Sequence, residues 1–190
     1  KAATEKSAKT DQIGYASRYA TGSILPKLTG GFTTTLYVHG FDFSASFDYQ
    51  LGGKIYDSRY ASLMSPRTSA SDAGKTFHKD IFNSWNAETN ASSDIPRWCY
   101  GDLYTSYASD RFLTSSNYLN FQSFTVGYTI PKKLTRKIQI DNVRIYCTGE
   151  NLYFWSARKG LDPRYAYDAN ETLNTYSPVR TIMGGIQVQF

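Results

Sequence analysis

Long hydrophobic runs are missing from this 190-residue chain. Its apolar stretches are only a few residues long, far short of the roughly 20 apolar residues that a membrane-spanning helix needs. This absence excludes spanning by helices. It does not exclude spanning by β-strands, because a strand of a membrane barrel needs only about 9–11 residues, of which alternate ones are apolar.

Cysteine and histidine are also scarce, with 2 of each. A disulfide framework needs more cysteines in a shorter chain, so we interpret Cys99 and Cys147 as free thiols. His39 and His78 are too far apart in the sequence to suggest a local zinc site. The sequence contains no nucleophile elbow, phosphate-binding loop, HExxH or CxxC motif. We therefore predict no enzyme activity, no catalytic residue, no metal ligand and no cofactor.

Charge of one sign is not concentrated on any long segment. The formal net charge of +5 is spread along the chain, and the one tight basic cluster lies in a predicted turn at residues 132–137. A nucleic-acid interface needs a larger basic face, so we expect no nucleic-acid partner. The chain begins with Lys1 and shows no signal peptide, which is typical of a mature fragment of a longer protein.

Aromatic residues, in contrast, are abundant and make up 16% of the chain. From Phe41 to Leu51, aromatic or apolar residues alternate strictly with polar ones. Such alternation predicts a strand with one apolar and one polar face. Asp42 and Asp48 share the polar face, but at about 3.3 Å per residue they lie too far apart for a glycosidase carboxylate pair. We expect both to face a polar lumen.

Four further segments alternate in the same way and are predicted as strands: residues 32–38, 118–130, 138–155 and 179–190. His39-Gly40 joins the first two strands as a tight hairpin, in which glycine supplies the unusual backbone angle. A bulge near Gln122-Ser123 is needed to bring the two halves of the third strand into one register. Arg144, on the polar side of the fourth strand, is also expected to face the lumen.

The predicted connections alternate in length. Short turns at residues 39–40 and 131–137 alternate with long loops at 56–117 and 156–178, the order found in outer-membrane barrels with periplasmic turns and extracellular loops. We therefore predict an all-β fold, a transmembrane antiparallel β-barrel of which this chain is the C-terminal part. The last strand would run inward, and Ile186, Val188 and Phe190 would form the terminus that the barrel-assembly machinery recognises.

A soluble β-sandwich or jelly roll explains the alternation equally well. It does not explain loops that are long on one side only, and five strands would leave two bare sheet edges in water. The corresponding alternative function is a soluble, secreted, β-rich carbohydrate-binding module, which differs from a membrane barrel in not depending on detergent.

A set of motifs follows in order along the chain: Leu25–Phe32, Gly40–Ser44, Tyr49–Asp57, Ser109–Leu113, Tyr118–Leu119, Gly127–Pro131, Glu150–Trp155, Gly160–Pro163 and the ending at Phe190. Together they resemble the C-terminal region of SusC/RagA-type TonB-linked outer-membrane proteins. Each motif is weak alone, but the ordered set covers nearly the whole chain from Leu25 onward. Residues 1–21 are polar and match only loosely.

The resemblance implies a barrel of about 22 strands around an N-terminal plug. This chain would supply roughly the last five strands, with residues 1–30 as an extracellular loop segment, residues 31–190 as barrel strands and loops, and no plug. The implied function is TonB-dependent import of a nutrient, most often an oligosaccharide or glycan and in some members a peptide. The implied partners are a SusD-like surface lipoprotein, outer-membrane lipid, and TonB through the absent N-terminal region.

The longer predicted loop holds five aromatic residues that would face the outside: Trp85, Trp98, Tyr100, Tyr104 and Tyr107. Aromatic side chains stack on sugar rings and also form protein interfaces. We therefore take these residues as candidates for contact with the substrate or the lipoprotein, and packing within the loop is the simpler alternative.

Overall fold

The computed structural model describes residues 18–70, 74–135, 140–165 and 178–190. The chain divides into two compact units. The sheet unit contains Leu25–Gly53, Ser115–Arg164 and the last strand, and the loop unit is built mainly from Lys54–Thr114.

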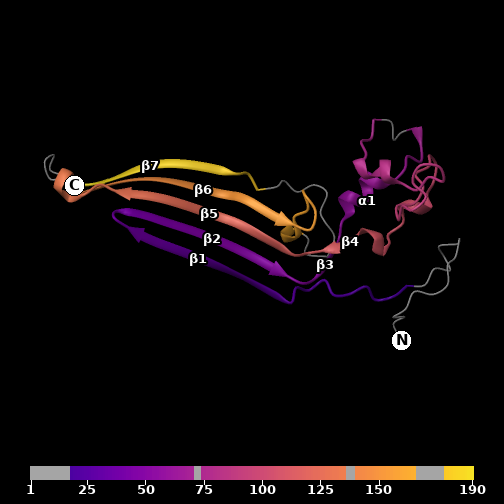
Figure 1. The fold of residues 1–190 in the computed structure, drawn as a ribbon, viewed down its shortest axis with the longest axis horizontal. Coiled ribbons are helices and arrows are strands. Elements are labelled where there is room, and N and C mark those ends of the chain that lie inside the picture. The colour runs from indigo at the N-terminus through magenta and orange to yellow at the C-terminus, as the bar shows by residue number, and fades with distance from the viewer. Residues whose placement is uncertain (1–17, 71–73, 136–139, 166–177) are drawn as a thin grey trace. The chain divides into compact units, whose positions relative to one another are not determined.

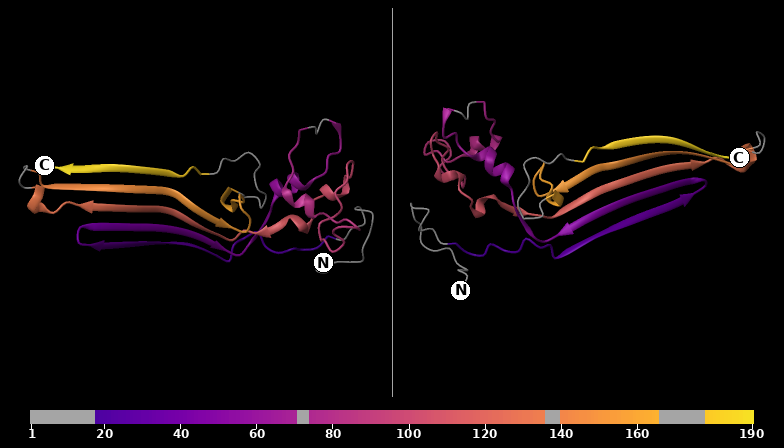
Figure 2. Two further views of the ribbon diagram at one scale, coloured as in Figure 1. Left: turned by 45° about the horizontal axis from the view of Figure 1, so that its top comes forward. Right: turned by 180° about the vertical axis from the view of Figure 1, so that it is seen from behind.

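Five long strands form the sheet unit: β1 (Leu28–Val38), β2 (Phe41–Leu51), β5 (Tyr118–Thr129), β6 (Asn142–Ser156) and β7 (Thr181–Gln189). They lie side by side in this order, and each neighbouring pair is antiparallel (Figure 1, Figure 2). The predicted strands are thus confirmed as one antiparallel sheet, and closure into a barrel stays a prediction. The first strand begins at Leu28, inside the segment assigned to the preceding loop, and the fourth begins at Asn142 rather than at residue 138.

The hairpin between β1 and β2 is as tight as predicted. His39 has a φ of 49° and Gly40 a φ of 87°, and two successive positive φ angles suit the right-handed twist of paired strands. A Cβ atom at Gly40 would lie 3.0 Å from the carbonyl oxygen of Thr129. Glycine is therefore favoured at this position by both its backbone angle and its surroundings.

The predicted bulge in β5 is present. Phe47 of β2 pairs with Phe121 and Ser46 pairs with Ser123, so that Gln122 is left without a partner on β2. The register between β5 and β6 shifts at the same level, where Asn151 adopts a φ of 52°. The bulge keeps Phe121 and Phe124 on the same face of the sheet, which makes the apolar face continuous.

The connections at the two ends of the sheet differ. The turns that join β1 to β2 and β5 to β6 lie at the end that the last strand reaches (Figure 2). The second of these turns contains a short helix, α2 (Lys132–Thr135), and residues 136–139 lie outside the described residues. The connection after β6 contains the 3-10 helix η7 (Pro163–Tyr165), and residues 166–177 are likewise not described. In the part of the chain that is described, no helix is long and apolar enough to cross a membrane.

The segment predicted as one long loop is folded, which corrects that interpretation. It contains β3 (Lys54–Tyr56), α1 (Ser58–Met64), η3 (Lys79–Asn83), η4 (Tyr104–Ser106), η5 (Asp110–Phe112) and β4 (Leu113–Ser115). β3 pairs with β4, and Ala61, Met64 and Phe112 form a small core. The ring of Phe112 meets those of Tyr56 and Tyr60 edge-on. Ala61 and Met64 are spaced as on one face of a helix. The helix has only 7 residues, which is too few for this period to be recognised in the sequence.

Asp57 begins this helix and is 2% exposed. Its carboxylate accepts a hydrogen bond of 2.8 Å from the backbone N–H of Tyr60, which caps α1. We expect Asp57→Ala to destabilise the loop unit by about 1–2 kcal/mol, because an N–H of the first helical turn loses its acceptor. Limited proteolysis of the full-length protein measures this as faster cleavage within residues 58–112.

Asp57→Asn is the matched control, because its side-chain oxygen still accepts from the N–H of Tyr60. It should resist the protease almost as well as the unchanged protein. If Asp57→Ala were equally resistant, the cap would contribute nothing measurable.

Candidate functional site

The two faces of the sheet differ sharply in chemistry. The register places these residues on one face: Phe32, Leu36, Phe41, Phe43, Phe47, Tyr49, Phe121, Val126, Ile145, Ile182, Ile186 and Val188. Phe47 stacks between Phe32 and Phe121, with ring centroids 4.8 and 4.6 Å away. Many of these side chains are exposed, including Leu36 at 58% and Ile186 at 68%. The described residues of the sheet unit therefore present an apolar face with many exposed side chains.

The opposite face is polar, and it carries the three residues predicted to face a lumen. Asp42 and Arg144 form an ion pair, in which Arg144 Nε donates to Asp42 Oδ1 at 2.9 Å and Nη2 donates to Oδ2. The pair passes over Gly127, whose missing side chain leaves room for it. The Arg144 guanidinium also lies 5.1 Å from the ring centre of Tyr146. The structure thus brings Asp42 and Arg144 together near the turn end of the sheet.

Hydroxyl groups occupy the middle of the polar face. Thr33 and Ser46 are hydrogen-bonded across β1 and β2 at 2.9 Å, and Thr125 and Thr148 across β5 and β6 at 3.1 Å. Cross-strand hydroxyl pairs of this kind stabilise a sheet modestly. The centre of this face is therefore polar, and Glu150 of β6 lies in the same cross-strand row as Ser46 and Ser123.

Asp48 lies toward the far end of the polar face from Asp42. Its Oδ1 accepts a hydrogen bond of 2.7 Å from Nδ2 of Asn120, a residue only 3% exposed. The two aspartates predicted to share a face do so, but they have different partners. The amide of Asn120 thus gives the Asp48 carboxylate a buried, uncharged hydrogen-bond donor.

The connection after β6 folds back onto this end of the same face. Leu161 is 1% exposed. Asp162 accepts two side-chain hydrogen bonds from Arg164, at 2.9 and 2.7 Å. The guanidinium of Arg164 lies 4.5 Å from the ring centre of Phe154, a polar-face position of β6. This ion pair and cation–π contact hold the start of the connection in place.

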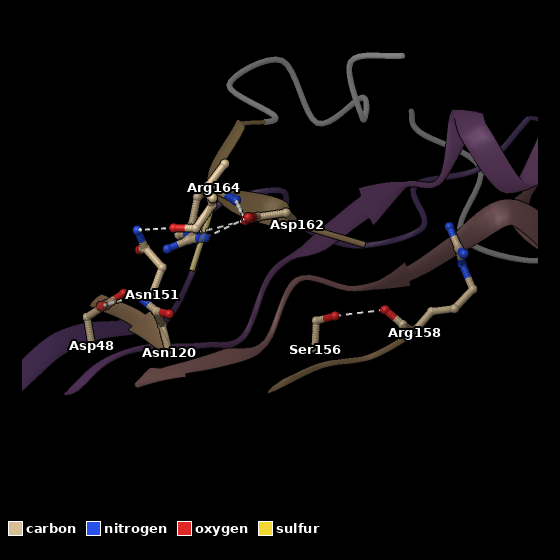
Figure 3. Close-up of polar contacts among 8 residues, drawn as sticks. Asp48, Asn120, Asn151, Ser156, Arg158, Asp162 and Arg164 are labelled. Carbon is tan, nitrogen blue, oxygen red and sulfur yellow. Dashed lines mark hydrogen bonds and ion pairs between the residues drawn. The ribbon is translucent and has the colours of Figure 1, made fainter. Parts of the chain in front are cut away.

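A pocket with a volume of about 340 Å³ lies beside these residues. Its lining combines aromatic, amide and charged side chains: Asn120, Asn151, Tyr153, Phe154, Trp155, Ser156, Lys159, Asp162, Arg164 and Pro178, together with Gly160 and Leu161. Figure 3 shows Asp162 and Arg164 bound to each other close to Asn120 and Asn151. The volume falls in the range of small-molecule sites, roughly 300–1,000 Å³.

The sequence did not point to this pocket. Its residues come from β5, from β6 and from the connection that follows, so no local spacing marks it. The sequence offered one signal, the motif Gly160–Pro163. This motif belongs to the SusC/RagA resemblance, but it did not predict which residues the segment contacts.

The five candidate aromatic residues all lie in the loop unit, but they do not form one cluster. Tyr104 and Tyr107 stack with ring centroids 6.5 Å apart, and Tyr100 and Trp85 are exposed. Trp98 instead packs edge-on against Phe77, and its indole N–H finds no acceptor among the described residues. Contact of these residues with a substrate or lipoprotein stays a prediction, and for Trp98 the packing alternative is favoured.

The cysteines and the end of β7 were also singled out from the sequence. Both cysteines are free thiols, as predicted, and both are exposed. Ile186 and Val188 lie on the apolar face of β7, and Phe190 follows the strand and is exposed. Their role as an assembly terminus stays a prediction. Within the described residues, no group of three or more His, Cys, Asp or Glu side chains gathers as a metal site does.

Among the described residues of the loop unit, Arg111 and Tyr56 have shifted pKa values. Burial lowers the pKa of Arg111, whose guanidinium lies 4.4 Å from the ring centre of Phe112. Burial raises the pKa of Tyr56, an effect that the nearby Arg111 charge opposes. A guanidinium remains charged in proteins and a tyrosine with a raised pKa remains neutral, so neither group supplies acid–base chemistry near neutral pH.

Comparison with known proteins supports the resemblance found in the motifs. No family model matches the chain. It is 27% identical over 189 residues to the TonB-dependent receptor P3 of Formosa agariphila, covering 94% of this chain and 18% of that protein. It is 28% identical over 163 residues to the TonB-dependent receptor SusC of Bacteroides thetaiotaomicron, covering 84% of this chain and 15% of that protein. The chain thus spans less than a fifth of the length of these relatives.

Solved structures show the same fold. The RagAB peptide importer in its closed-closed state superposes with a TM-score of 0.74 at 23% identity, covering 96% of this chain and 19% of that chain. A second structure of the RagAB peptide transporter gives a TM-score of 0.72 at 24% identity, covering 90% and 18%. The resemblance to SusC/RagA-type TonB-linked proteins is therefore confirmed.

Proposed function

We propose that this chain forms part of the wall of a transmembrane β-barrel in a TonB-dependent receptor of the SusC/RagA type, which imports a nutrient across the bacterial outer membrane. The two-faced sheet carries this proposal. One face exposes stacked phenylalanines and aliphatic side chains, and the other carries ion pairs and hydroxyls. A barrel wall needs this division, because lipid covers its outer face and water or protein fills its lumen.

A soluble carbohydrate-binding module is supported less well. A soluble domain would have to cover the apolar face, since water-exposed apolar patches of this kind are rare in monomeric proteins. The strands are also long for a soluble sheet: β6 has 15 residues and β5 has 12, against a usual strand length of about 5–6.

The proposal includes the partners of such a receptor. TonB would act through a region outside this chain, and a SusD-like lipoprotein would cover the extracellular side. The similarity to SusC and to the RagAB fold supports both expectations. We propose a glycan as the nutrient, because the polar face of the sheet and the pocket beside it are rich in hydroxyl and amide groups.

Cell fractionation and uptake measurements test this function. The full-length protein that contains this chain should fractionate with the outer membrane and require detergent for extraction. Cells that carry it should take up its glycan against a gradient, and dissipating the proton-motive force should reduce uptake to background. The matched control is an isogenic strain that lacks the gene but expresses all other transporters.

Recovery of the full-length protein as a monomer in plain buffer would exclude the barrel. Uptake that continued unchanged after the proton-motive force was dissipated would exclude energy coupling through TonB while leaving the barrel in place.

A further inference from the structure

We propose that Arg180, together with the aromatic rings of Tyr153 and Trp155, binds the phosphate group of an outer-leaflet lipid at the membrane surface. This inference rests on the proposed function, since it takes the apolar face of the sheet as the face that contacts lipid. Three features of the sheet unit support it: the face on which these side chains lie, their depth along the strands, and the unbalanced positive charge of Arg180.

Tyr153 and Trp155 lie on the apolar face of the sheet. In the register, Tyr153 is opposite Phe121 and Trp155 is opposite Leu119, and both partners belong to that face. The two rings have centroids 4.4 Å apart, and Tyr153 and Trp155 are 52% and 47% exposed. Tyrosine and tryptophan combine an apolar ring with a polar tip, which favours them at the boundary between lipid chains and water. The pair therefore suits the level of the lipid headgroups.

Arg180 is a neighbour of Tyr153 on the same face. Ile182 is paired with Gly149 on the apolar face, and side chains along a strand alternate between faces. Arg180 is two residues before Ile182, so it is the next side chain directed to the apolar face. Tyr153 is the corresponding next paired position beyond Gly149, on the far side of the bulge in β6. The guanidinium and the two rings therefore share one corner of this face.

The stagger of the strands fixes the depth of Arg180. The middle residue of β2 is Ser46 and that of β7 is Gly185, but the register aligns Gly185 with Asp42. Strands of a tilted barrel are staggered in this way, so depth is counted from the middle of each strand. Arg180 is five residues from Gly185, toward the end of the sheet opposite the short turns. At about 3.3 Å per residue and a tilt of about 40°, this is roughly 13 Å, or half of an apolar band about 25 Å tall. Arg180 thus lies where the lipid headgroups begin.

The positive charge of Arg180 is not balanced by a protein carboxylate. Its side chain is exposed, and it forms no ion pair within the described part of the chain. The register places no Asp or Glu of the described strands on the apolar face. An arginine is far less costly near the surface of a bilayer than at its middle, and a guanidinium can donate two parallel N–H···O bonds to a phosphate. The position therefore favours a headgroup that carries a phosphate.

Lipid A is the occupant that fits these groups. It is the membrane anchor of lipopolysaccharide in the outer leaflet, and its phosphate is attached to a sugar that also carries acyl chains. A phosphate bound by Arg180 would leave the sugar against Tyr153 and Trp155, and the acyl chains along the stacked rings of Phe47 and Phe121. A soluble anion would gain none of these apolar contacts.

Site-specific photocrosslinking in the full-length protein that contains this chain tests the inference. Tyr153→benzoylphenylalanine, irradiated in outer membranes, should give an adduct with lipid A that mass spectrometry identifies. Tyr146→benzoylphenylalanine is the matched control, because Tyr146 lies on the same strand but on the polar face, opposite Gly127. It should give no lipid adduct. Retention of heat-modifiable mobility in gels verifies that each variant is folded.

Reconstitution isolates the role of the phosphate. The Tyr153→benzoylphenylalanine protein is placed in phosphatidylcholine vesicles that contain either lipid A or enzymatically dephosphorylated lipid A. The adduct yield should be roughly three- to tenfold higher with lipid A, and Arg180→Gln should remove this difference, because the charge-assisted hydrogen bonds are lost. Arg97→Gln is the matched control, since it removes an exposed charge from the loop unit, and it should leave the difference unchanged.

Equal adduct yields with the two forms of lipid A, or a difference that persists in Arg180→Gln, would overturn the inference and leave the barrel in place. The absence of any lipid adduct at Tyr153, or a lipid adduct at Tyr146, would contradict the lipid-facing side itself and with it the proposed function. The two failures are therefore distinguishable.

Discussion

Replacing Phe47 by arginine should prevent the proposed receptor from accumulating in folded form in the outer membrane. Phe47 lies within the apolar face of β2 and stacks on Phe32 and on Phe121. If this face contacts lipid, a guanidinium near the middle of the bilayer costs about 2–4 kcal/mol. The variant also loses both ring stacks. The measurement is the amount of heat-modifiable receptor in isolated outer membranes.

Ser46→Arg is the matched control for this substitution. Ser46 is the neighbour of Phe47 on the same strand, but it points to the polar face, where it pairs with Thr33. The same charged side chain should be tolerated there, because it meets water and polar groups. If both variants assembled normally, or if Ser46→Arg were the more damaging one, the assignment of the lipid-facing side would be wrong.

Gly127→Ala should cost the folded sheet about 1–3 kcal/mol, the usual range for forcing extra atoms into a filled space. A Cβ atom there would lie 2.6 Å from Oδ2 of Asp42 and 2.7 Å from Nε of Arg144. These distances require the ion pair to separate or the strands to shift. Urea unfolding of the full-length receptor in lipid vesicles measures the loss as a lower midpoint.

Gly184→Ala provides the matched comparison. A Cβ atom at Gly184 of β7 would meet only the carbonyl oxygen of Tyr146, at 3.9 Å. The same substitution should therefore leave the midpoint nearly unchanged. A double-mutant cycle isolates the cause, because Gly127→Ala should lose most of its effect in an Asp42→Ala background. A full effect that persisted without Asp42 would show that the ion pair is not what the glycine accommodates.

The sheet was predictable from local patterns because strand residues alternate between faces with a period of two. In Phe41–Leu51, the alternation predicted that each aromatic side chain and the next side chain along the strand point to opposite faces of the sheet. The register confirms this. The bulge at Gln122 followed from the same rule, since Phe121 and Phe124 share a face only if one residue is left over. The starts of strands were less predictable, because flanking residues such as Ile140 and Asp141 continue the pattern but lie outside the strand, although the N–H of Asp141 still donates to the carbonyl oxygen of Gln189.

The candidate site was predictable only in part. Asp42, Asp48 and Arg144 were placed on one face by counting along single strands. Their partners were not predictable, because the contact between Asp42 and Arg144 crosses 102 residues of sequence and an intervening strand. Arg164, Asn120 and Lys159 were missed for the same reason. The core around Phe112 was hidden in a segment whose helices are too short to show a period.

The sequence by itself determined that this protein is built from long two-faced strands, and its ordered motifs identified the SusC/RagA resemblance. Alternation is a local property, so it survives in any single stretch of chain. Only the tertiary structure decided which polar residues meet, and that Asn151, Lys159 and Asp162 line one pocket. These features depend on strand register and on the return of a connection over the sheet, which no local spacing encodes.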